Sequence, residues 1–225
     1  MRTADHNSRR ADAQTVSSKY RRSWTWTMAV LAALAAAPAF AGPDQAKQIV
    51  STNCAACHGA DGNSHQPTFP KLAGLQAEYL AKQLEEYGDG KRKSDIMGPI
   101  ARKLKPEEIR VLAAYFSAQT PAPGSVEDNP LAEHGKKIYL QGYSDAGGAS
   151  CSSCHKPDGS GTDRFPRLAE QQRAYVVQQL KEFKRGARTN DHGRVMQVIA
   201  GRMTEQEMKA VAEYIAGLSS AQARR

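Results

Sequence analysis

The sequence of 225 residues has few cysteines and no long hydrophobic segment. Its 4 cysteines all lie in two Cys-x-x-Cys-His segments, so none remains for a separate metal site. The most apolar run, residues 28–37, has about ten residues and is too short to span a bilayer comfortably. No segment shows the alternation of apolar and polar residues that is typical of a β-strand. These absences favour a helical chain organised around the two cysteine segments.

The two segments begin at Cys54 and Cys151, and each ends in a histidine, His58 or His155. This pattern is typical of covalent haem attachment, in which two thiols bind the porphyrin and the next histidine ligates the iron. A zinc site needs a second cysteine pair some 15–20 residues on, and disulfides or a thioredoxin-like motif leave the histidines unexplained. The sequence therefore predicts two covalent haem c groups, attached through Cys54, Cys57, Cys151 and Cys154.

Residues 1–41 have the features of an export signal. A basic segment precedes the apolar run, and Ala39-Phe40-Ala41 forms a small-x-small cleavage site before Gly42. We expect a signal peptide that is cleaved after Ala41, and hence a periplasmic protein. The alternative is an uncleaved membrane anchor.

The charge of the chain does not indicate a nucleic-acid partner. The formal net charge is +8, but the basic leader contributes part of this excess and each haem adds two propionate carboxylates. A nucleic-acid-binding protein is expected to carry a basic patch or stripe on one face. We interpret the cluster Lys91, Arg92 and Lys93 as solvated loop charge.

The rest of the chain contains two copies of one unit. We predict an N-terminal domain over 42–120, a proline-rich linker over 121–128 and a C-terminal domain over 129–225. The second copy repeats the first at a nearly constant spacing. Matching residues are Phe69, Pro70, Leu72, Tyr79 and Met97 in the first copy, and Phe165, Pro166, Leu168, Tyr175 and Met196 in the second.

Each copy is predicted to be helical. Asp44 is expected to cap a first helix, and the helix that contains Leu80 is expected to end at Gly88. Pro106 suits a first helical position, and Thr204 with Glu207 matches a capping box. Two apolar stripes with helical spacing follow, formed by Ile109, Leu112, Ala113 and Phe116 and by Met208, Val211, Ala212 and Ile215.

This duplicated, exported chain resembles the dihaem class I cytochromes c, specifically the cytochrome c4 type. The resemblance covers essentially all of 42–225. The stretches that carry it are residues 57–63, 69–74, 113–116 and 154–168. It implies an all-α fold of two tandem class I cytochrome c domains, each a small helical bundle around one covalent haem.

The resemblance also implies the axial ligands of the two irons. They are His58 with Met97, and His155 with Met196. Methionine–histidine ligation raises the reduction potential, and two filled axial positions leave no place for a substrate. We therefore expect an electron-transfer protein with no catalytic residues and no small-molecule substrate.

Further residues are assigned through the same resemblance. The carbonyl groups of Pro70 and Pro166 are expected to accept the Nδ1–H of the ligand histidines. The alternative is that these prolines merely turn the chain. For the second haem, His192 and Met203 are alternative ligands. Met196 is preferred because it is expected in an extended stretch, whereas Met203 takes the place of a core leucine.

The resemblance implies periplasmic electron transfer between a membrane respiratory donor, such as a membrane cytochrome, and a terminal oxidase or other acceptor. Its partners would be redox proteins, and peripheral association with the membrane is compatible with this role. An alternative is a cytochrome subunit of a periplasmic dehydrogenase complex. A dihaem peroxidase is disfavoured, because it requires an open axial position and a longer chain.

Overall fold

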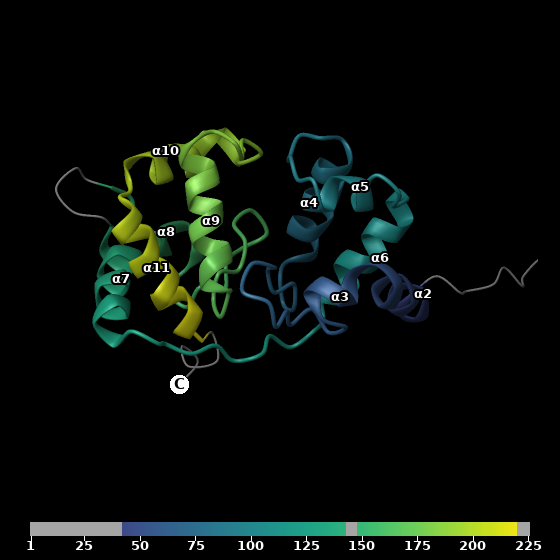
Figure 1. The fold of residues 1–225 in the computed structure, drawn as a ribbon, viewed down its shortest axis with the longest axis horizontal. Coiled ribbons are helices and arrows are strands. Elements are labelled where there is room, and N and C mark those ends of the chain that lie inside the picture. Colours follow the sequence, from purple (N-terminus) through teal and green to yellow (C-terminus); the bar gives the residue numbers. More distant parts are fainter. Residues whose placement is uncertain (1–41, 143–147, 220–225) are drawn as a thin grey trace, which may run out of the picture. The chain divides into compact units, whose positions relative to one another are not determined.

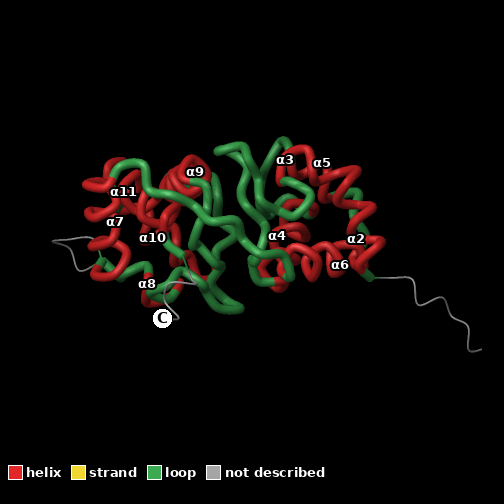
Figure 2. The backbone as a smooth tube through the Cα atoms, turned by 90° about the horizontal axis from the view of Figure 1, so that it is seen from below, coloured by secondary structure: helices red, strands yellow, loops and turns green. Residues whose placement is uncertain are grey.

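The computed structural model describes residues 42–142 and 148–219. The predicted signal peptide and the last residues of the predicted C-terminal domain lie outside the described residues. Residues Ala41–Arg225 form one compact unit. The described part consists of helices and loops and contains no strand, which confirms the predicted all-α fold (Figure 2). None of its helices combines the length and the apolar character needed to cross a membrane.

The first copy contains five α-helices and one π-helical turn (Figure 1). They are α2 (Pro43–Ile49), η1 (Val50–Cys54), α3 (Ala55–His58), α4 (Ala77–Gly88), α5 (Met97–Ala101) and α6 (Pro106–Ser117). α4 packs against α5 and α6, and α2 packs against α6. α2, η1 and α3 follow one another without a break, so a continuous helical segment leads into the first cysteine motif.

The second copy repeats this order. Its elements are α7 (Asn129–Gln141), α8 (Ser152–His155), α9 (Arg173–Lys184), the 3-10 turn η2 (His192–Arg194), α10 (Val195–Arg202) and α11 (Glu205–Gly217). α11 packs against α7 and α9, and α10 packs against α9. Here the first helix and the cysteine motif are separate elements, because α7 ends at its C-cap residue Gly142, whose φ is 90°.

Each copy has its own apolar core, and both predicted stripes are buried. Burial of each large aliphatic or aromatic side chain contributes about 1.5–3 kcal/mol relative to leaving it exposed. The first core contains Val50, Leu75, Leu80, Leu112, Ala113 and Phe116. The larger second core includes Tyr139, Val176, Leu180, Phe183, Met203, Met208, Val211 and Ile215.

Most of the predicted helix ends are confirmed, and one is wrong. α4 ends at Gly88, α6 begins at Pro106, and Thr204 forms the predicted capping box at the start of α11. The N-cap of α2, however, is Gly42 and not Asp44. Because Pro43 takes the first helical position, Asp44 lies inside the first turn, where its charge still favours the helix N-terminus.

Glutamine side chains connect the two copies within the compact unit. Gln76 Nε2 donates to the carbonyl of Ser160 at 2.7 Å, and Gln172 Nε2 donates to the carbonyl of Ser64 at 2.6 Å. Gln171 donates to the carbonyl of Lys71 at 2.9 Å and accepts from its amide at 2.8 Å. The loops that carry the predicted histidine-binding prolines are therefore bonded to the opposite copy.

Candidate haem-binding sites

The first cysteine motif lies on the continuous helical segment that ends at His58. Cys54 and Cys57 are three residues apart along it, so both thiols lie on the same side of the helix. Both thiols are free and partly buried, whereas His58 is buried with 6% exposure. Burial raises the pKa of the Cys54 thiol to about 11, so it is protonated at neutral pH. Gly59 ends the segment with a positive φ of 78°.

The second motif has the same arrangement at the short helix α8, with Cys151 as the N-cap residue before it. Cys151 and Cys154 are free, and His155 is buried with 6% exposure. Burial raises the pKa of the Cys151 thiol to about 11. The residue that ends the helix here is Lys156, with φ 65° and ψ 157°. It adopts a conformation that is nearly restricted to glycine.

Each motif histidine contacts the predicted proline carbonyl. His58 Nδ1 lies 3.0 Å from the carbonyl oxygen of Pro70, and His155 Nδ1 lies 2.8 Å from that of Pro166. A carbonyl can only accept, so Nδ1 carries the proton and Nε2 keeps a free lone pair for a metal. Burial lowers the pKa of both histidines, against the opposing effect of the carbonyl bond, and so favours the neutral form.

The two predicted methionines lie at helix N-termini. Met97 is the first residue of α5, and Met196 is the second residue of α10. The extended stretch expected around Met196 is therefore wrong, because α10 begins at Val195. Met203 is the C-cap residue that follows α10 and is 1% exposed within the second core, while His192 is exposed in η2.

One cavity of about 750 Å³ connects these groups. Its lining includes most of the predicted ligands from both copies: Cys54, Cys57, His58, Met97, Cys151, His155 and Met196. Most of the other lining side chains are apolar or aromatic, such as Leu72, Leu80 and Phe116. Thiols, a neutral imidazole and a soft thioether around an apolar space are the groups that hold haem c, so the residues fit this cofactor.

A model of the cytochrome c family matches the chain twice, over residues 43–119 and 132–219. Cytochrome c4 of Pseudomonas aeruginosa is 40% identical over 191 residues, which cover 84% of this chain and 93% of that protein. The chain belongs to the cytochrome c family, in its cytochrome c4 group. As a dihaem cytochrome c, it binds two haem c groups covalently through its two Cys-x-x-Cys-His motifs. It is an electron-transfer protein and not an enzyme.

A solved structure and a further relative in sequence are also similar to this cytochrome. The crystal structure of reduced cytochrome c4 from Pseudomonas stutzeri superposes on this cytochrome with a TM-score of 0.75 at 38% identity. The match covers 79% of this chain and 100% of that structure. A protein of Thiomonas intermedia named thiosulfate dehydrogenase electron acceptor is 36% identical over 170 residues, covering 74% of this chain and 78% of that protein.

The prediction that Arg92 is solvated loop charge is wrong. Lys91 and Lys93 are exposed, as expected for solvated loop charge, but Arg92 is 4% exposed and lines the haem cavity. The repeat contains a signal that could have shown this, because Arg92 corresponds to Arg188 at the same spacing that relates Tyr79 to Tyr175. An arginine that recurs in a repeated core is unlike ordinary surface charge.

Proposed function

We propose that this cytochrome is a periplasmic electron carrier with histidine–methionine ligation at both irons. The ligands would be His58 and Met97 in the first domain, and His155 and Met196 in the second. The repeated histidine–proline contact carries this proposal, because it orients an unprotonated Nε2 in both copies. The partly buried methionines that line the same cavity support the assignment of the sixth ligand.

Complete ligation explains why such a site transfers electrons without catalysis. With His58 and Met97 on one iron and His155 and Met196 on the other, no ligand position would be left for a substrate or for peroxide. The soft thioether and the apolar lining both favour the less charged ferrous state, and therefore a high reduction potential. The role of the protein is to hold the ligands in place in both oxidation states.

Spectroscopy of the reduced protein tests this ligation. We expect an intact mass that exceeds the polypeptide by two haems, two low-spin irons, and negligible carbon monoxide binding at neutral pH. Prompt binding of carbon monoxide to one haem would show an open axial position and contradict the proposal. Heat-unfolded protein, in which the methionine ligands are released, provides a positive control for binding.

We also propose that residues 1–41 are a signal peptide that is removed after Ala41. The mature protein would then consist of the domains 42–120 and 129–225 and the linker 121–128. The support is the basic and apolar pattern of the leader, together with a family match that begins at residue 43. N-terminal sequencing of the native protein should start at Gly42. Full-length chain in the membrane fraction would instead indicate an anchor.

The proposed donor is a membrane cytochrome of a quinol-oxidising complex, and the proposed acceptor is a terminal oxidase. Native membranes supplied with a quinol donor should reduce the purified protein, and oxidase-containing membranes should reoxidise it. Boiled membranes are the control. Failure of both reactions would refute this pair of partners while leaving the haem ligation untouched.

The second candidate is a cytochrome that accepts electrons from a periplasmic dehydrogenase. The similarity to a protein named thiosulfate dehydrogenase electron acceptor favours it. Co-purification with a dehydrogenase chain, or rapid reduction by such an enzyme in the presence of thiosulfate, would support this alternative. Reduction by quinol-supplied membranes alone would favour the respiratory carrier.

A further inference from the structure

An open groove on the second domain lies apart from the haem site. It is a space of about 560 Å³ lined by residues of α7, α9 and α11, which pack together in this copy (Figure 1). Of the described residues, only Gln178 lines both this groove and the haem cavity. We call it the α9 groove, because most of its lining belongs to α9 and to the residue that caps the end of α9, Arg185.

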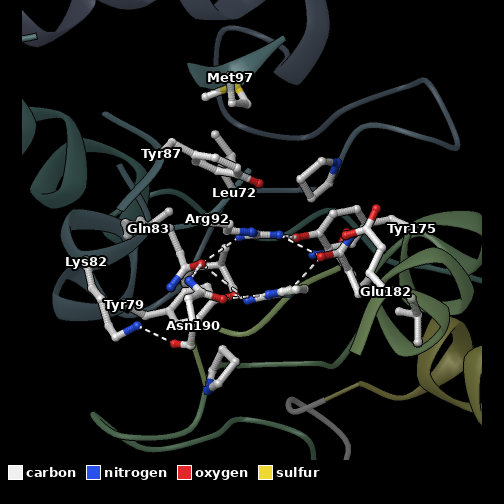
Figure 3. Close-up of a pocket in the computed structure, with 18 of the residues that line it drawn as sticks. Leu72, Tyr79, Lys82, Gln83, Tyr87, Arg92, Met97, Tyr175, Glu182 and Asn190 are labelled. Atoms are coloured by element: carbon white, nitrogen blue, oxygen red, sulfur yellow. Dashed lines mark hydrogen bonds between the residues drawn. The ribbon is translucent and has the colours of Figure 1, made fainter. Parts of the chain in front are cut away.

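The α9 groove and the haem cavity lie on opposite sides of α9. Val177 and Lys181, about one helical turn apart, line the groove. Val176 and Leu180 line the haem cavity, together with Tyr175 (Figure 3). A molecule bound in the α9 groove would therefore contact the second domain without entering the haem site.

The walls of the α9 groove are basic and its floor is apolar. Three of the cations share one face of α9 and extend over about 18 Å of its length, since they are about two turns and then one turn apart. The cations that line the groove are Arg173, Lys181, Arg185 and Lys209. The apolar side chains among them are Leu131, Ala174 and Val177.

The acidic lining residue Glu213 does not repel an anionic ligand. It is 5% exposed, and its carboxylate accepts from Arg173 Nε at 2.6 Å and from the amide of Asp128 at 3.1 Å. These bonds direct its charge toward its own partners. The other cations of the groove keep their positive charge for a ligand.

The ion pairs of these cations are exposed and easily exchanged. Lys181 lies 2.9 Å from Glu205, and the two side chains are 40% and 68% exposed. Arg185 lies 4.0 Å from Glu182 and is itself 67% exposed. Exposed ion pairs contribute little to stability, so a ligand can replace them. Within the described residues, no carboxylate lies within 4.0 Å of Lys209.

The first copy carries the opposite charge at the equivalent positions. At the spacing that relates Tyr79 to Tyr175, Lys181 corresponds to Glu85 and Arg185 corresponds to Asp89. At the same spacing, the small Ala174 corresponds to Glu78. The fold that both copies share does not require cations at these positions. The basic lining is therefore a property of the second domain alone.

The charge and the shape of the α9 groove together indicate what binds there. Cations one and two turns apart along α9 match carboxylates with the same spacing on a second helix laid beside it. The small side chains of Ala174 and Val177 allow the apolar face of such a helix to approach closely. A flat lipid surface would not follow a groove between helices.

We propose that the α9 groove binds an acidic amphipathic helix of a redox protein partner and so tethers that partner to the second domain. The proposal rests on the proposed electron-carrier function for the nature of the partner. Binding should weaken as salt is added, because exposed charges are screened. Charge attraction of this kind mainly speeds association, which suits a carrier that must also leave its partner.

A synthetic peptide tests the occupant on the full haem-loaded protein. The probe is a helical peptide with glutamates one and two turns apart beside a stripe of alanine and leucine, and the control peptide has glutamine in place of glutamate. Isothermal titration calorimetry at low and high ionic strength measures binding. We expect the acidic peptide to bind at low ionic strength, and the neutral peptide not to bind. Equal binding of both peptides would overturn the proposal.

Charge reversal tests the site. The double variant Lys181→Glu with Arg185→Asp gives the second domain the residues of the first, and should weaken peptide binding roughly tenfold or more, because like charges then face each other. Lys136→Glu with Lys137→Asp is the matched control, since both lysines are exposed on α7 and do not line the groove. Unchanged binding in the groove variant, or an equal loss in the control, would overturn the proposal. If the groove variant does not fold, Lys181→Ala with Arg185→Ala should still weaken binding.

Two other occupants give different results. If phosphatidylglycerol vesicles bind the unmodified protein but not the groove variant, and the peptide does not bind, the groove takes a lipid surface. If the unmodified protein self-associates in sedimentation experiments and the groove variant does not, the groove takes a second copy of this chain through its acidic α4. Either result would overturn the proposal.

Electron-transfer rates separate a failure of the α9 groove from a failure of the proposed function. Reduction by quinol-supplied membranes and reoxidation by oxidase-containing membranes are measured at low ionic strength. We expect the groove variant to be slower than the α7 control in at least one of these reactions. Equal rates in both reactions would overturn the tether. If the unmodified protein takes part in neither reaction, the carrier function with these partners is refuted, while the peptide titration still decides whether the groove binds an acidic helix.

Discussion

Replacement of single methionines in the second domain decides which of them ligates the iron. Met196 lies near the start of α10 and is partly buried, whereas Met203 directly follows the same helix as its C-cap and is 1% exposed in the core. Both side chains line the haem cavity. We predict that Met196→Ala removes about half of the near-red absorbance that arises from methionine–iron bonds, because one of two such bonds is lost. One of the two reduction potentials should fall.

The cost in stability should follow the opposite order. Truncation of a fully buried methionine to alanine removes its packing and leaves a cavity, at a cost of about 2–5 kcal/mol. Met203→Ala should therefore lower the melting temperature of the second domain by roughly 10 °C or more, since a domain of this size loses about 4–8 °C per kcal/mol. Its near-red spectrum should not change. Met196→Ala loses less packing, because its side chain is partly exposed.

Two controls belong to this experiment. Met208→Ala removes another fully buried methionine from the same core, and should reproduce the loss of stability without a spectral change. Met97→Ala should remove the remaining half of the near-red absorbance through the first domain. The assays are near-red absorption of the oxidised protein and thermal unfolding followed by circular dichroism. Spectral loss in Met203→Ala but not in Met196→Ala would refute the assignment.

Two other predictions concern stability. Lys156 has φ 65° and ψ 157°, close to the φ 78° and ψ 154° of Gly59 at the same place in the first copy. Lys156→Gly should therefore relieve backbone strain and stabilise the protein by about 1 kcal/mol. An unchanged or lower melting temperature would contradict this prediction. Burial would raise the pKa of Glu213, but Arg173, whose Nε donates at 2.6 Å, and two backbone amides lower it overall. A lowered pKa in the folded state stabilises the protein above the ordinary value of 4.5, and this contribution is lost as the pH falls through the folded pKa. The Glu213→Gln variant should therefore have a lower free energy of unfolding than the unmodified protein at neutral pH, and this free energy should fall less on acidification. If the free energy of unfolding of both proteins falls equally steeply at acidic pH, the assignment is wrong.

Features that depend on neighbouring residues were predictable from the sequence. The two haem motifs are five-residue segments, and the chemistry of their thiols and histidines follows from that short spacing. Pro106 and Thr204 mark helix starts through their own backbone and side-chain bonds. The prediction for Asp44 was wrong for an equally local reason, since Pro43 already suits the first helical position and moves the cap to Gly42.

Only the tertiary structure decided the environment of Arg92. Between two lysines, it has the local sequence of a solvated loop, and its burial depends on residues far along the chain. Its partners Tyr175 and Gln179 are 83 and 87 residues away, and both belong to the other copy. Such contacts form only when the two copies meet, because these two acceptors of Arg92 belong to the opposite copy. The sequence by itself thus determined where the haems are attached, while the packing of one copy against the other decided which charged residues reach the haem cavity.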